Sequence, residues 1–365
     1  MRRGMGVAVK IGLLALALYL TAGGLKGAAA LKETEKTLTL VSQGEEWKAG
    51  EIRAFLREQD GQDGEESGVD FVLWGQEGEV NLLEKETGRT CQAEILFLCG
   101  SSRLLYPGGQ ILDEEDEEGC LIGKKSAREL FQTEQVVGRK ITFQNRAYQI
   151  RGVLEEESSM LLVRAEDQRT LERVTARVGV DQTCLKVQSA LEAAYGLTGK
   201  ELKWRLLYGL AKLGNLALLT VMGLCIAWVV GRSGNRGVRW NKGRMCIFYL
   251  IFGLLWAVFL GSQFTFPQEY LPDQWSDFAF WSGLWEQTRE ELQILIKTGK
   301  RGPEVSIVLL FLQTVGRQAG GAVLWLLQAG MYVSEKIRHQ ECYASVKKCG
   351  MIEKMQENRI TRRHT

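Results

Sequence analysis

Four long apolar segments constrain this chain more than any other feature, because their length and hydropathy suit them to crossing a lipid bilayer. They lie near the N-terminus, at about 213–230, at about 246–262, and within 305–333. Whole-chain averages hide them: apolar residues make up 45% and charged residues 25%, with a net charge of +2. We therefore expect a multi-pass membrane protein, and the near-zero net charge gives no case for nucleic acid as a partner.

The first apolar segment has two readings. It begins with Arg2 and Arg3, continues as a run of membrane-spanning length, and ends in the small residues of 26–30. A basic start and small residues after an apolar run are typical of a cleaved signal peptide. The same run is long enough for a first transmembrane helix. Either reading places the following residues outside the cytoplasm.

Basic residues predict the orientation of the spans. The loop at 231–245 carries five basic residues and no acidic one, and the tail at 334–365 is also basic. With four spans, both segments and the N-terminus fall on the same side, which the positive-inside rule makes cytoplasmic. The loop is therefore our candidate contact with a cytoplasmic partner, through Arg232, Arg236, Arg239, Lys242 and Arg244.

The last apolar segment contains three polar residues near its middle: Gln313, Arg317 and Gln318. An arginine at the centre of a bilayer costs several kcal/mol unless it faces protein or water. Three alternatives stay open: a structural arginine that pairs with a neighbouring helix, a coupling or substrate site, or a span boundary placed elsewhere. We take the three residues as a candidate intramembrane polar site.

Residues 31–203 predict one α+β domain, because they lack apolar runs long enough to span lipid and mix two periodicities. Two strongly polar loops, Gln59–Ser67 and Asp113–Glu118, interrupt it; the second lacks the spacing of an EF-hand and is expected to be a solvated loop. Expected strands are Thr37–Val41, Phe71–Trp74, Ala93–Leu98, Ile141–Phe143, Tyr148–Leu154 and Met160–Val163, and expected helices are Glu46–Arg57, Lys125–Phe131 and Gln188–Tyr195.

The outer loop at 263–304 contains aromatic residues at helical spacing, with Ser276 or Asp277 as a plausible helix cap. Two environments fit such a helix: the membrane interface, where aromatic rings lie at the headgroup level, or packing beneath the outer domain. The residues concerned are Trp275, Phe278, Trp281, Leu284 and Trp285.

Residues for catalysis or metal binding do not form a recognisable set. The only histidines are His339 and His364, both in the basic tail, and the chain has no P-loop, HExxH or GxSxG motif. No CxxC pair occurs, which argues against a structural zinc site. The four cysteines of the outer domain are open to two readings, a disulfide or free buried thiols. We expect no enzyme activity, no cofactor and no bound metal.

The segment from Gly119 to Leu154 reads as an apolar run, a short helix ending at Leu130–Phe131, and a β-hairpin turning at Asn145–Arg146. It resembles the C-terminal part of the core ectodomain of MacB-type ABC transporter permeases, in which an LF helix end precedes a strand pair. The matching residues are Leu130, Phe131, Val137, Gly138, Ile141, Tyr148, Ile150, Gly152, Val153 and Leu154.

The resemblance implies an FtsX-like permease architecture: an uncleaved helix in 1–30, an extracytoplasmic domain in 31–203, three helices in 204–333 and a cytoplasmic tail in 334–365. It implies a subunit that does not hydrolyse ATP and that couples a separate cytoplasmic ABC ATPase to its outer domain, for export or for acting on envelope partners. The implied partners are the lipid bilayer, that ATPase and, as an open alternative, a second permease subunit. The rival interpretations are a non-transporting sensor or assembly protein and, less favoured, a membrane-anchored enzyme.

Overall fold

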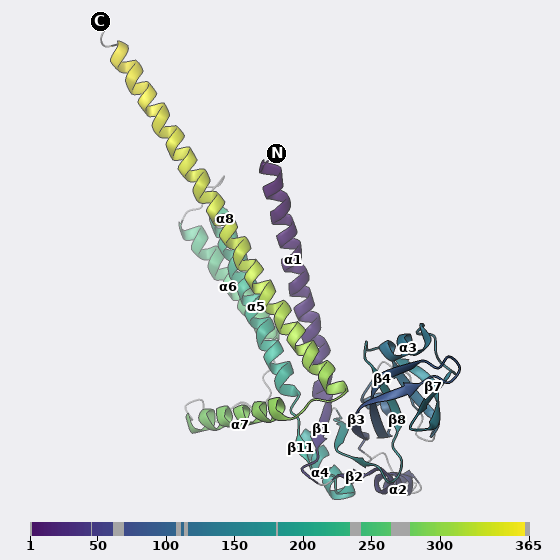
Figure 1. The fold of residues 1–365 in the computed structure, drawn as a ribbon. Coiled ribbons are helices and arrows are strands. Elements are labelled where there is room, and N and C mark those ends of the chain that lie inside the picture. Colours follow the sequence, from purple (N-terminus) through teal and green to yellow (C-terminus); the bar gives the residue numbers. More distant parts are fainter. Residues whose placement is uncertain are drawn as a thin grey trace. The chain divides into compact units, whose positions relative to one another are not determined.

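A computed structural model describes residues 2–44, 46–60, 69–106, 111–112, 116–179, 182–233, 242–263 and 278–361 (Figure 1). The chain divides into two compact units. The helical unit comprises Met1–Ala29, Gly209–Asp273 and Phe311–Thr365, and the sheet unit comprises Ala30–Tyr208 and Gln274–Leu310. Each unit is described by itself below.

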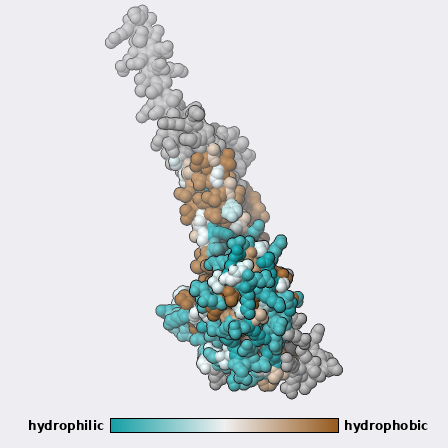
Figure 2. Space-filling view, turned by 45° about the vertical axis from the view of Figure 1, so that its right-hand side comes forward, coloured by the Kyte–Doolittle hydropathy of each residue, from teal (hydrophilic) through white to brown (hydrophobic). Residues whose placement is uncertain are grey.

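The helical unit is built from the apolar segments. Its helices are α1 (Arg2–Leu31), α6 (Lys242–Gln263), and most of α5 (Arg205–Ser233) and α8 (Pro303–Thr361), whose first turns belong to the sheet unit. Among the described residues, three segments are long and apolar enough to cross a membrane: Ala8–Lys36, Arg205–Val229 and Pro303–Tyr332; the apolar part of α6, Tyr249–Gly261, is shorter. Apolar residues, coloured brown in Figure 2, gather on the surface of this unit.

The sheet unit is organised by one mixed sheet of nine strands in the order β11-β1-β10-β3-β4-β8-β5-β7-β6. Two neighbouring pairs, β4 with β8 and β5 with β7, are parallel, and the other pairs are antiparallel. One further pairing, of Leu83 with Thr142, joins β6 back to β3. The strands are β1 (Thr37–Val41), β3 (Phe71–Leu83), β4 (Thr90–Gly100), β5 (Gly119–Gly123), β6 (Lys140–Phe143), β7 (Arg146–Leu154), β8 (Met160–Arg164), β10 (Arg173–Arg177) and β11 (Lys200–Glu201), and a separate pair is formed by β2 (Trp47–Lys48) and β9 (Thr170–Leu171).

The sheet has a core on each face, because successive side chains of a strand point to opposite sides. Leu73 of β3 and Ile95 of β4 belong to the larger core, which packs against α2 (Ala49–Asp60), α3 (Lys124–Phe131) and α4 (Cys184–Tyr195). The smaller core contains Val72, Trp74, Leu96, Leu98, Leu104, Leu105, Tyr106, Leu112, Leu121, Leu154, Met160 and Leu162. The prediction of a mixed α/β domain between an N-terminal apolar helix and a C-terminal set of apolar helices is confirmed.

The predicted hairpin is formed by β6 and β7. Tyr148 and Ile150 are buried, whereas Arg151 is exposed, as expected for a strand with one buried face. The turn lies one residue earlier than predicted, at Gln144–Asn145, whose φ angles are 46° and 67°. Positive φ angles at both central residues give a two-residue turn the backbone twist that matches its two strands, and asparagine tolerates such angles well.

Several element boundaries differ from the sequence predictions. Helix α2 begins at Ala49 rather than Glu46, because Trp47 and Lys48 pair with β9. Helix α4 begins at Cys184 rather than Gln188, after Thr183 caps it by accepting from the amide of Lys186 at 3.4 Å. Strands β5 and β10 had no counterpart among the predicted strands, and α8 continues through the predicted tail as far as Thr361.

Some predictions concern residues that the structure does not describe. Most of the first polar loop, the first half of the acidic run (113–115), and the proposed cap residues Ser276 and Asp277 lie outside the described residues. Helix α7 is described from Phe278 to Lys297 and belongs to the sheet unit. The stretch Gln274–Leu310 contains most of the loop predicted at 263–304 and the start of the predicted last span, and it clusters with the outer domain.

Candidate functional site

The segment that leads into helix α8 lies against the smaller core of the sheet unit. Gly302 has a φ of +43°, and a Cβ there would lie 2.9 Å from Cδ1 of Leu96 and 3.7 Å from Cε of Met160. Both the backbone conformation and the close approach favour glycine over any other residue. We call residues 299–304, together with the sheet residues that they contact, the α8 junction.

A buried ion pair forms the centre of the α8 junction. Arg173 of β10 pairs with Glu304 in the first turn of α8, and each side chain is only 3% exposed. Nη2 of Arg173 also donates to the carbonyl oxygen of Gly299 at 2.7 Å, and its guanidinium carbon lies 5.2 Å from the centre of the Trp74 ring. A charge buried this deeply is tolerated only when it is paired, so the sheet and α8 depend on each other here.

A second arginine supports the pair. Arg301 forms an ion pair with Glu172, and its Nη1 donates to the carbonyl oxygen of Gln76 at 3.1 Å. The backbone amide of Arg301 donates to Oε2 of Glu304 at 3.1 Å. A carboxylate in the first turn of a helix is further favoured by the helix dipole. The junction therefore pairs each of two arginines with a glutamate: Arg173 with Glu304, and Arg301 with Glu172.

Lys300 extends this polar group toward the start of α5. Its amino group donates to the carbonyl oxygens of Leu295 and, at 2.6 Å, Thr298, and lies 5.8 Å from the centre of the Trp204 ring. Burial lowers the pKa of Lys300, an effect that Glu304 opposes and Arg173 reinforces. A lysine with a lowered pKa and several acceptors acts here as a structural donor.

The start of α5 is attached to the same unit. Trp204 is 1% exposed, the amide of Leu202 donates to the carbonyl oxygen of Thr39 at 2.8 Å, and Lys203 pairs with Glu291 of α7. Two helices that contain candidate spans, α5 and α8, are thus held by the outer domain through buried or paired side chains. These contacts are made within the sheet unit, which includes the first turns of both helices.

Within the helical unit, one of the predicted polar residues forms a defined contact. Gln318 is 4% exposed, and its Nε2 donates to the carbonyl oxygen of Ala211 at 2.8 Å and to Oδ1 of Asn215 at 2.9 Å. A Cβ at Gly214 would lie 2.1 Å from Oε1 of Gln318. Small residues and interhelical amide bonds of this kind are typical of packing between membrane helices.

Helix α1 approaches α8 through glycines. A Cβ at Gly27 would lie 2.1 Å from Oγ1 of Thr314, and one at Gly23 would lie 3.0 Å from Cδ of Arg317. Arg317 thus lies along α1 and is half-buried, whereas Gln313 is exposed and does not join the contact. The structure therefore brings together two of the three residues of the candidate intramembrane polar site. We call this contact among α1, α5 and α8 the polar seam.

The candidate cytoplasmic contact lies mostly beyond the described residues. Arg236 and Arg239 are outside them, and the backbones of Arg232, Lys242 and Arg244 are helical while their side chains are not described. The α8 junction, by contrast, was missed at the sequence level. The order Gly302, Pro303, Glu304 marks a helix start with an acidic first turn, but no local pattern identifies Arg173 as its partner.

Metal or disulfide chemistry is not evident in the part of the chain that the structure describes. No group of three or more His, Cys, Asp and Glu side chains there is placed to hold a metal ion. The outer-domain cysteines Cys91, Cys99, Cys120 and Cys184 are all buried, and Cys91 and Cys120 are free thiols. Burial raises the pKa of the Cys91 thiol to about 11, although a hydrogen bond with Ser126 opposes this effect, and so keeps the thiol protonated.

Comparisons with known proteins identify one domain. Residues 102–194 match the family model described as the MacB-like periplasmic core domain, which includes the whole segment from Gly119 to Leu154. The resemblance predicted from that segment is confirmed. No curated protein matches the chain. The match and the apolar helices together support a membrane protein with an extracytoplasmic domain.

Two solved structures are similar to the chain at low identity. The periplasmic region of MacB from Actinobacillus actinomycetemcomitans is 14% identical over 44% of this chain and 85% of its own, with a TM-score of 0.34. The extracellular domain of the noncanonic ABC-type transporter YknZ from Gram-positive bacteria is 15% identical over 45% of this chain and 97% of its own, with a TM-score of 0.32.

Proposed function

We propose that this chain is a permease-type membrane subunit of an ABC transporter. The observation that carries the proposal is the match of residues 102–194 to the MacB-like periplasmic core domain, within a sheet unit flanked in sequence by apolar helices. The given residues contain no P-loop, and the proposal assigns ATP hydrolysis to a separate cytoplasmic subunit. The substrate class is not part of the proposal.

The proposed topology has four spans and both ends in the cytoplasm. Three spans correspond to the apolar segments of α1, α5 and α8, and α6 supplies the fourth. The basic residues between α5 and α6 and those after Tyr332 then lie on the cytoplasmic side, in agreement with the positive-inside rule. The sheet unit lies on the opposite side.

The α8 junction supports a mechanical role within this proposal. A displacement of α8 acts on β10 through the Arg173–Glu304 pair. Because the pair is buried, water cannot take the place of either partner when α8 moves. Small shifts of a helix are amplified when they reach a packed, paired contact instead of a flexible linker. The subunit would thereby convert motion at the cytoplasmic face into motion of the outer domain.

A second candidate function is a non-transporting sensor or assembly protein with a MacB-like outer domain. It is favoured by the short connection between α5 and α6: α5 ends at Ser233 and α6 begins at Lys242, which leaves residues 234–241 between them. A connection of this length offers little room for a helix that contacts an ATPase. The two functions differ in whether an ATPase accompanies the chain.

Gentle purification of the full chain from its native membrane tests the choice. The permease proposal expects an ATPase subunit to copurify, while the chain alone neither binds nor hydrolyses ATP. The triple variant Arg236→Glu, Arg239→Glu, Lys242→Glu should weaken this association by reversing the proposed contact surface.

The triple variant needs a matched control, because charge reversal in a cytoplasmic loop can also change the orientation in which the helices insert into the membrane. Lys125→Glu, Lys140→Glu, Lys186→Glu makes the same change in charge at exposed positions of the sheet unit and should retain the ATPase. External labelling must show the same topology in both variants. Native preparations that repeatedly contain no ATPase would favour the sensor or assembly protein.

A further inference from the structure

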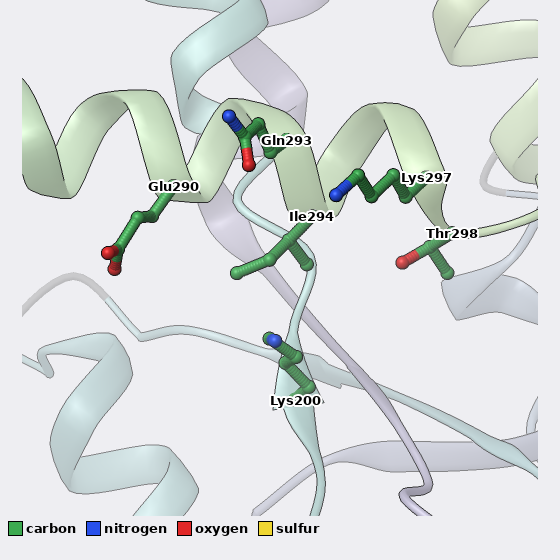
Figure 3. Close-up of a pocket in the computed structure, with 6 residues that line it drawn as sticks. All are labelled: Lys200, Glu290, Gln293, Ile294, Lys297 and Thr298. Atoms are coloured by element: carbon green, nitrogen blue, oxygen red, sulfur yellow. The ribbon is translucent and has the colours of Figure 1, made fainter.

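A pocket of about 410 Å³ lies between helix α7 and strand β11, at the edge of the sheet (Figure 3). Its lining comes from two places in the sequence: Lys200 of β11 reaches toward the helix, and the remaining residues belong to α7 or follow it directly. The lining residues are Lys200, Glu290, Gln293, Ile294, Lys297 and Thr298. All of them belong to the sheet unit.

Three charged side chains of this pocket have no partner among the described residues. Lys200, Glu290 and Lys297 are exposed and form no ion pair there, whereas the adjacent Glu291 is paired with Lys203. Because these charges are exposed and solvated, a ligand can pair with them without breaking an existing ion pair. Two ammonium groups suit a phosphate, and a carboxylate suits an amine.

The position of the pocket in the sequence places it close to the bilayer surface in the proposed topology. Lys200 precedes the candidate span that begins at Arg205 by five residues, and Thr298 precedes the one that begins at Pro303 by five residues. Five residues extend at most about 17 Å. The headgroup layer occupies roughly 5–8 Å on each side of the hydrocarbon core. Both walls of the pocket are therefore connected to a candidate span by a segment of at most about 17 Å.

Apolar side chains on the same helix support a position at the interface. Trp285 is 70% exposed and Ile296 is 78% exposed, on a helix that also carries the pocket residues Glu290 and Lys297. Tryptophan is enriched at membrane–water interfaces, where its ring lies among the headgroups. Exposed apolar residues next to a charged pocket are thus explained if lipid covers them.

We propose that this pocket binds the headgroup of a phospholipid that carries one phosphate and a primary amine. Lys200, Lys297 and the hydroxyl of Thr298 donate to the phosphate, Glu290 accepts from the ammonium group, and Ile294 contacts the glycerol or acyl portion. The proposal rests on the membrane topology of the proposed function and is independent of whether an ATPase is bound.

Calorimetric titration of the full chain in detergent tests the proposal, with short-chain phosphatidylethanolamine, short-chain phosphatidylglycerol and inorganic phosphate as probes. Phosphatidylethanolamine should bind more tightly than the other two. The variant Lys200→Gln, Lys297→Gln should bind it about tenfold or more weakly, because two charge-assisted hydrogen bonds are lost. Glu290→Gln should lose the preference for the amine-bearing lipid over phosphatidylglycerol.

The control variant Lys125→Gln, Lys186→Gln removes the same charge at exposed lysines elsewhere in the sheet unit and should bind like the original chain. Equal binding of inorganic phosphate and phosphatidylethanolamine would overturn the lipid assignment. Unchanged affinity in the Lys200 and Lys297 variant would overturn the site itself. Copurification of an ATPase, measured on the same variant, should be unaltered, so that failure here is distinct from failure of the proposed function.

Discussion

Removing one charge of the Arg173–Glu304 pair should loosen the attachment of helix α8 to the sheet unit. The two side chains are each 3% exposed, so Glu304→Gln leaves a buried arginine with only the more distant carboxylate of Glu172, at 3.9 Å, as its counter-charge. Breaking a buried pair from one side costs about 3–5 kcal/mol. With about 1.4 kcal/mol per factor of ten, this corresponds to roughly a 150- to 4,000-fold change in the equilibrium for local opening.

Hydrogen exchange of the full chain in detergent measures this opening. The amides of Glu304 and Val305 donate to the carbonyl oxygens of Arg301 and Gly302 at 3.0 and 3.1 Å, so they report directly on the α8 junction. Their protection should fall by the factor given above in Glu304→Gln and in Arg173→Met. Amides in the middle of a distant element should be unaffected in both variants.

Two further variants make the test specific. Arg177→Met, on the same strand, removes an ion pair with Asp70 whose side chains are 52% and 51% exposed, and should cost no more than about 1 kcal/mol. The double variant Arg173→Met, Glu304→Met replaces both charges by apolar groups and should recover most of the protection. The reasoning is refuted if the single variants match Arg177→Met, or if the effects of the two single changes simply add.

Three other predictions address the outer domain, the polar seam and the topology. Ile150→Ala should lower the stability of the outer domain by about 2–5 kcal/mol, since Ile150 is fully buried. Arg151→Ala should cost below about 1 kcal/mol, because its ion pair is partly exposed. Equal shifts of the two variants in thermal unfolding of the full chain would contradict the assigned face. Gly27→Val should lower the thermal stability of the detergent-solubilised chain by overpacking against α8, at about 1–3 kcal/mol, whereas Gly12→Val, which has open space around it, should not. A single cysteine at Asn235 should resist a membrane-impermeant reagent applied from outside, and labelling there would rule out the four-span topology.

The outer domain shows which elements sequence patterns predict well. Helix α3 and the hairpin of β6 and β7 were predicted because their signals are local: an amphipathic run ending at Phe131, and alternation through Tyr148 and Ile150. Strand β10 was missed because it begins with Arg173 and ends with Arg177, and charged residues at both ends argue against a buried strand. The strand is buried between β1 and β3, and its Arg173 is paired with Glu304, a partner that no local pattern reveals.

The candidate sites also divide into those with a local sequence signal and those formed only by tertiary contacts. The polar residues of α8 stood out within an apolar run, so Arg317 and Gln318 were identified from sequence, but their neighbours on α1 and α5 were not. Glycines at 23 and 27 have the small-residue spacing of closely packed helices and offered a usable signal. The α8 junction and the pocket beside α7 arise from tertiary contacts between distant segments, and only the fold brings their residues together.

The central claim is that a chain without a nucleotide-binding motif is moved by ATP through a partner. Hydrogen exchange of residues 299–305, compared with and without ATP in the natively purified complex and in the chain alone, tests it most directly. The account predicts a nucleotide-dependent change in protection at the α8 junction in the complex and none in the isolated chain. Identical protection in the complex with and without ATP, or an ATP response of the chain alone, would contradict it.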